Sequence, residues 1–76
     1  MIPYDWTLLE SGSIRKAKYV PNEHDLRGDL HIEFMTGKSY KFKDVPQHKV
    51  EKMCHHSSPG SYFHNEIRGE HASEKV

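Results

Sequence analysis

The architecture follows from one stretch, Asp29-Leu30-His31-Ile32-Glu33-Phe34-Met35-Thr36-Gly37-Lys38-Ser39-Tyr40-Lys41-Phe42-Lys43. Apolar and polar side chains alternate on both sides of the tight connection Thr36-Gly37-Lys38. Such alternation is typical of antiparallel strands that bury one face. The stretch therefore predicts a β-hairpin. Its expected buried face consists of Leu30, Ile32, Phe34, Tyr40 and Phe42.

A third strand is expected before the hairpin, over residues 14–20. One of its faces carries Ala17 and Tyr19, and the other carries Lys16 and Lys18. Strict alternation would place Ile14 on the lysine face. We therefore expect a β-bulge near Arg15, which would return Ile14 to the apolar face.

Two short helices are expected after the hairpin. The first runs from about Pro46 to His55, where Val50, Met53 and Cys54 form one apolar stripe. Ser57-Ser58-Pro59-Gly60 ends it, and Tyr62 to Ile67 suggests a second helix. The sequence thus predicts an α+β domain in which a three-stranded antiparallel meander packs with two short C-terminal helices.

The two ends of the chain differ from this core. Ile2, Tyr4 and Trp6 alternate with polar residues or proline, which favours an extended N-terminal arm over residues 1–12. Residues 13–68 form the expected domain, and residues 69–76 are polar and expected to be a flexible tail. The arm could be available to a partner, or Trp6, Leu8 and Leu9 could fold back onto the domain.

Length and composition narrow the class of protein. Seventy-six residues suffice for one small core, and 11 Lys plus Arg balance 11 Asp plus Glu. Cys54 is the only cysteine, and no long apolar run is present. We therefore expect a protein of the reducing cytoplasm, with no membrane segment.

Catalytic chemistry is not indicated by the residue spacing. No nucleophile stands at a recognisable distance from a base and an orienting group. Cys54-His55-His56 does not reproduce the paired ligands of a structural zinc site. We therefore expect a non-enzymatic binding protein with no metal, no cofactor and no small-molecule substrate.

Two groups of residues are candidates for binding a partner. The first is the basic face of the sheet, and the second is the apolar arm. The basic face comprises Arg15, Lys16, Lys18, Lys41 and Lys43, and the arm contributes Ile2, Tyr4 and Trp6. The lysines could equally be the solvated side of an open sheet, or could contact RNA phosphates.

The order of these motifs resembles the KTSC domain family over residues 13–68. The residues that carry the resemblance are Ser13-Ile14, Lys18-Tyr19, Leu30 to Phe34, Gly37, Tyr40-Lys41-Phe42, Val45-Pro46, Val50, Ser58 to Phe63 and Ile67-Arg68. The family's Tyr-any-Tyr motif is Tyr40-Lys41-Phe42 here, and the usual asparagine after Tyr62-Phe63 is displaced to Asn65. The resemblance implies a non-enzymatic domain, found free-standing and at the end of some lysyl-tRNA synthetases, for which RNA binding is suggested.

The size, the family core and the apolar arm also resemble small phage proteins that act in the cytoplasm of a bacterial host, where they bind RNA polymerase. That resemblance implies a phage-encoded transcription regulator, an inhibitor or an antiterminator, with RNA polymerase or an associated factor as partner. The alternative is an RNA-binding module of the synthetase-appendage type, which would use Arg15, Lys16, Lys18, Lys41 and Lys43 on phosphates.

Overall fold

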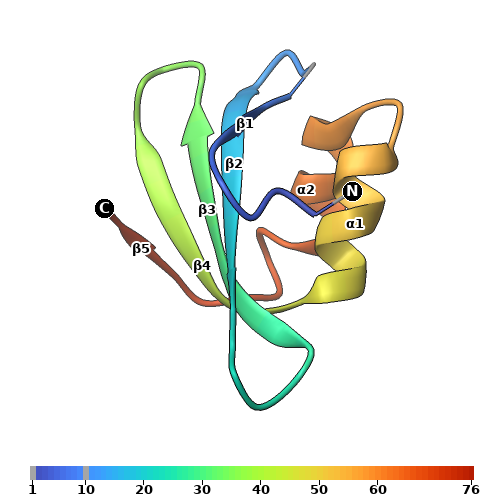
Figure 1. The fold of residues 1–76 in the computed structure, drawn as a ribbon. Coiled ribbons are helices and arrows are strands. Elements are labelled where there is room, and N and C mark those ends of the chain that lie inside the picture. The colour runs from blue at the N-terminus through green and yellow to red at the C-terminus, as the bar shows by residue number, and fades with distance from the viewer. Residues whose placement is uncertain (1, 10) are drawn as a thin grey trace.

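The structure, a computed structural model, describes residues 2–9 and 11–76. It is a five-stranded antiparallel sheet in the order β1-β2-β3-β4-β5, with two helices packed on one face (Figure 1). The elements are β1 (Thr7–Leu8), β2 (Ile14–Pro21), β3 (Arg27–Phe34), β4 (Ser39–Pro46), α1 (Gln47–His55), α2 (Pro59–Glu66) and β5 (Ser73–Lys75).

The predicted hairpin is confirmed as β3 and β4. Leu30 lies opposite Phe42, and Ile32 lies opposite Tyr40, so their side chains share the face that the helices cover. The connection turns at Gly37, whose φ of 91° lies in the left-handed region that glycine adopts at little cost. Local alternation was therefore sufficient to define this pair.

The β-bulge near Arg15 is also confirmed. The register between β2 and β3 shifts between Ile14 and Lys16. The shift leaves Ile14 fully buried on the helix side, whereas Arg15 and Lys16 lie on the opposite side. An extra residue in one strand is the ordinary way to change the face of the residues that precede it.

The prediction of three strands is wrong in number, because both ends of the chain add a strand to the sheet. Thr7 and Leu8 pair with Ala17 and Lys16 at one edge. Residues 73–75 pair with residues 40–42 of β4 at the other edge. Met1 and Glu10, which belong to the predicted arm, lie outside the described residues.

The boundaries of the helices differ slightly from the predicted ones. Strand β4 continues to Pro46, and α1 begins at Gln47. Proline opens the second helix instead: Pro59 is the first residue of α2, three residues before the predicted start. Gly60 fits there because an added Cβ would lie 2.5 Å from Oγ of Ser13 and 2.9 Å from Oγ of Ser11.

The core lies between the sheet and the helices. Its fully or nearly fully buried apolar residues are Ile14, Ala17, Tyr19, Leu30, Ile32, Phe42, Val45, Val50, Met53, Phe63 and Ile67. Half-buried Ile2, Leu9, Phe34, Tyr40, Cys54 and Tyr62 pack around it. The opposite face of the sheet carries no helix (Figure 1), and we call it the open face. Neither helix in the described part of the chain is long and apolar enough to cross a membrane.

Candidate partner-binding face

The open face collects most of the residues predicted to bind a partner. Alternation along the strands directs Lys16 and Lys18 of β2 to this face, together with Lys41 and Lys43 of β4. The bulge adds Arg15, which reaches Glu33 on the neighbouring strand. The predicted basic residues thus lie on one side of the sheet, on β2 and β4, and β3 places His31 and Glu33 between them.

Trp6 lies on this same face, just before β1. The Nζ of Lys16 is 4.8 Å from the centroid of the indole ring, within the range of a cation–π contact. The His31 ring meets the indole edge to face, with centroids 6.3 Å apart. Trp6 keeps 40% of its surface exposed, and Leu8, opposite Lys16, keeps 75%. We call Trp6, Leu8, Lys16, Lys18 and His31 the Trp6 patch.

His31 lies at the centre of this patch and is opposite Lys18 in the sheet. Burial lowers the pKa of its imidazole, and the positive charges of Lys18 and Lys41 lower it further, while Asp29 acts in the opposite direction. A neutral imidazole beside Trp6 is therefore favoured at neutral pH. The charge of the patch then comes from its two lysines.

The other arm residues do not join Trp6. Ile2 is half-buried against the core, so it is not presented to solvent as an anchor. The Tyr4 ring is 56% exposed, and its hydroxyl accepts a hydrogen bond from Nε2 of Gln47 at 3.3 Å. Ile2 therefore points toward the core, Tyr4 toward α1 and Trp6 toward the open face.

The lysines of the open face are largely engaged in ion pairs. Glu33 is 3.7 Å from Nε of Arg15 and 4.0 Å from Nζ of Lys16. Glu74 of β5 is 2.8 Å from Nζ of Lys41 and 3.7 Å from Nζ of Lys43. The hydrogen bond with Glu74 raises the pKa of Lys41, and the same contact lowers the pKa of Glu74. The face is mixed in charge rather than uniformly basic.

Four residues of this face were not predicted from the sequence: Leu8, His31, Glu33 and Glu74. His31 and Glu33 could have been predicted, because the alternation that buries Leu30 and Ile32 directs these two residues to the lysine side of the sheet. Leu8 and Glu74 could not, because each belongs to a very short edge strand.

The Tyr-any-Phe motif lies on the other side of the sheet. The Phe42 ring is buried and meets the ring of Phe63 edge to face, with centroids 5.0 Å apart. Tyr40 is half-buried and packs in the same way on Phe34, at 5.9 Å. A cavity of about 550 Å³ beside them is also lined by His64 and Arg68. The motif is therefore part of the core and of one cavity wall.

The cysteine and histidines do not gather into a metal site. Among residues 2–9 and 11–76, no three His, Cys, Asp or Glu side chains are placed to hold one ion. Cys54 is half-buried on α1, and burial raises the pKa of its thiol, which disfavours the reactive thiolate.

The comparisons with known proteins agree with this architecture. A crystal structure of a KTSC domain protein from Yersinia pestis superposes with a TM-score of 0.84, at 22% sequence identity, over 95% of this chain and 96% of the other. At that identity the likeness shows the fold alone. No curated protein matches the chain significantly. The KTSC domain family model matches residues 10–71. The family model thus matches most of the chain, and the chain belongs to the KTSC domain family.

Proposed function

We propose that this KTSC domain is a non-enzymatic binding protein that docks on a protein partner through the Trp6 patch. The observation that supports this proposal is the position of Trp6. Its indole lies on the helix-free face of the sheet, held between Lys16 and His31, with 40% of its surface open to solvent. A tryptophan that is fixed in position but still exposed is typical of the anchor of a protein interface.

The surroundings of Trp6 suit a protein interface. Exposed Leu8 adds apolar surface on β1, opposite Lys16, and Lys16 and Lys18 provide a charged rim. An apolar centre with a polar rim is the usual anatomy of such contacts. Because Lys16 and His31 already hold the ring, little conformational freedom would be lost when a partner covers it.

The charge of the face favours protein over RNA. Phosphate binding draws its affinity from cations that are free to replace counterions. Here Lys41 and Lys43 share Glu74, and Arg15 and Lys16 share Glu33. The aromatic residues Tyr40 and Phe42 face the helices and cannot serve as stacking surfaces for bases on the open face.

The partner class we propose is bacterial RNA polymerase or a factor associated with it. The support for this identification is the resemblance to small phage transcription regulators. A module of this size would act by covering a surface of the polymerase or by stabilising one of its states, as an inhibitor or an antiterminator does. Either action requires only a difference in affinity between states.

RNA is the second candidate, and Lys18 is the observation in its favour. Within the described residues, Lys18 makes no ion pair, and it lies one strand away from the Trp6 ring. A base stacked on Trp6 with its phosphate on Lys18 would use both side chains. Such binding would weaken as salt rises, more steeply with each further phosphate that a lysine binds, whereas an interface anchored by Trp6 would weaken less.

The test is affinity capture from bacterial lysate with and without nuclease, read by mass spectrometry. The proposal expects RNA polymerase subunits that resist nuclease and are lost with Trp6→Ala. The matched control is Leu26→Ala, which removes an apolar side chain that is 77% exposed and lies in the loop before β3. Capture that vanishes with nuclease would instead assign RNA as the partner.

A further inference from the structure

We propose that the outer edge of β4 is a second binding site, for an extended acidic peptide, and that β5 occupies it as an internal ligand. This site lies at the opposite edge of the sheet from β1 (Figure 1), and its Lys41 is opposite His31 of the Trp6 patch. It does not depend on the proposed function, and its partner can be a different molecule.

The contacts of β5 define what the site recognises. Ser73, Glu74 and Lys75 run antiparallel to residues 40–42. Further backbone hydrogen bonds extend the pairing at both ends, from Lys43 N–H to the Ala72 carbonyl at 2.8 Å and from Val76 N–H to the Ser39 carbonyl at 3.0 Å. Backbone pairing of this kind accepts any extended peptide without regard to its side chains.

Selectivity would come from Lys41 and Lys43 of β4, which bind the carboxylate of Glu74 in β5. Its two oxygens lie 2.8 Å from Nζ of Lys41 and 3.7 Å from Nζ of Lys43. The two ammonium groups therefore converge on one position of the added strand, which favours an acidic residue and disfavours a basic one. The expected ligand is an extended segment with Glu or Asp opposite Lys41.

The internal strand is held weakly enough to be exchanged. All three of its side chains are exposed, and none contributes to the core. A segment with few buried contacts opens more easily than the rest of a domain. By contrast, β4 keeps its own place through Phe42 and Val45, both of which are buried. The strand can therefore leave while its binding edge stays intact.

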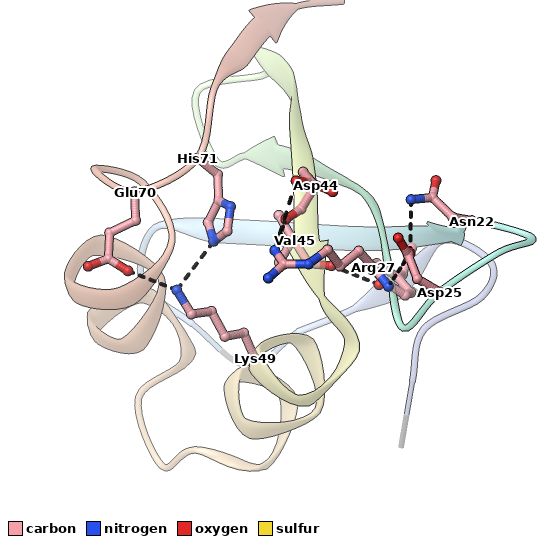
Figure 2. Close-up of polar contacts among 9 residues, drawn as sticks. Asn22, Asp25, Arg27, Asp44, Val45, Lys49, Glu70 and His71 are labelled. Atoms are coloured by element: carbon pink, nitrogen blue, oxygen red, sulfur yellow. Dashed lines mark hydrogen bonds and ion pairs between the residues drawn. The ribbon is translucent and has the colours of Figure 1, made fainter.

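A contact upstream of β5 limits how far the strand can move. Lys49 of α1 reaches the chain between α2 and β5, where its ammonium group contacts Glu70 and His71 (Figure 2). This contact keeps β5 near the edge of β4 after release. A tethered strand acts at a high effective concentration, so an outside peptide competes poorly unless the pairing is weakened.

The test is to weaken the pairing of β5 with β4 by the substitution Glu74→Lys and to measure how tightly the altered protein binds a peptide. The probe is an acetylated, fluorescein-labelled peptide with the sequence of residues 71–76, and anisotropy reports its binding at low salt. Replacing two attractive contacts by repulsive ones should increase the affinity for the probe about tenfold over the unaltered chain. The same peptide with its glutamate changed to lysine should not bind.

The matched control reverses the pair. Lys41→Glu and Lys43→Glu combined with Glu74→Lys restore opposite charges at both contacts, so β5 should close the edge again. The acidic probe, whose glutamate would then face two carboxylates, should bind no better than it binds the unaltered chain. Circular dichroism would show that each variant is folded. The proposal is overturned if folded Glu74→Lys gains no affinity, or if it binds the lysine peptide equally well.

Discussion

The Nζ of Lys49 lies 3.3 Å from Nε2 of His71, at the junction of α1 with the chain that leads into β5 (Figure 2). The same ammonium group donates to the Glu66 carbonyl and to Oε2 of Glu70, both at 2.8 Å. An ammonium has three donors, so all three are used when Nε2 of His71 acts as an acceptor. This arrangement requires a neutral imidazole with its proton on Nδ1.

Acid should therefore destabilise the fold through His71. Burial lowers the pKa of this imidazole below its ordinary value of 6.5, and Lys49 lowers it further. Because the unfolded chain then binds the proton more readily than the folded one, the stability that depends on neutral His71 is present above about pH 6.5 and is lost as the pH falls below it. We expect His71→Gln to lose less unfolding free energy than the unaltered chain between pH 7.5 and pH 5.

Urea denaturation of both proteins at the two pH values measures this difference. His24→Gln is the control, because His24 is exposed in the loop between β2 and β3 and should leave the pH dependence as it was. If the unaltered chain and His71→Gln lose the same unfolding free energy between pH 7.5 and pH 5, protonation of His71 does not cause the acid destabilisation.

A second prediction concerns the hydroxyl of Tyr19, which is buried and donates a hydrogen bond to the Val45 carbonyl at 2.8 Å. Tyr19→Phe removes the donor and leaves a buried carbonyl without this partner. The expected cost is about 1–2 kcal/mol of unfolding free energy at neutral pH, measured by urea denaturation.

The same variant should show a distinct alkaline behaviour. Burial raises the pKa of Tyr19 to about 12, from an ordinary value of 10.0. The unfolded chain therefore loses this proton first, and the stability associated with it is present below pH 10 and is lost as the pH approaches 12. The difference in unfolding free energy between Tyr19→Phe and the unaltered chain should therefore shrink between pH 10 and pH 12. A constant difference would show that the hydroxyl does not titrate in this way.

The hairpin and the bulge could be predicted from sequence because each depends on neighbours along the chain. Alternation fixed which face of β3 is buried, and the break in alternation at Ile14 located the bulge. The predicted basic face followed from the same rule. His31 and Glu33 could have been added to it by extending that argument.

The edge strands could not be predicted because they depend on contacts distant in sequence. Ser73, Glu74 and Lys75 have little intrinsic preference for a strand, and they pair because β4 offers an open edge. Alternation predicted only part of the arm, since Thr7 and Leu8 do form a strand. Before β1 the chain turns, because Tyr4 N–H bonds to the Ile2 carbonyl at 3.0 Å and Trp6 N–H bonds to Oδ1 of Asp5 at 2.9 Å.

A third prediction concerns Gly28, which lies opposite Pro21 at the point where β2 ends. A Cβ at this position would overlap the carbonyl oxygen of Val20 and would lie 2.7 Å from Cα of Pro21. Because the obstacles are backbone atoms, a change of rotamer cannot relieve them. We expect Gly28→Ala to lose about 2 kcal/mol or more of unfolding free energy. Gly69→Ala is the control, since a Cβ there meets no atom within 4 Å, and its effect should stay within about 0.5 kcal/mol.

The last prediction separates binding from stability at Trp6. The ring is 40% exposed, so Trp6→Ala should lower the unfolding free energy by only about 1 kcal/mol, whereas Phe63→Ala, at a fully buried ring, should lower it by about 3–5 kcal/mol. Trp6 is the only tryptophan, so fluorescence of the unaltered chain reports on this ring alone. When the captured partner is added, the emission should shift to shorter wavelength and acrylamide quenching should fall, because the partner excludes water from the indole. If the emission and the quenching stay unchanged while the partner binds, the interface lies elsewhere on the domain.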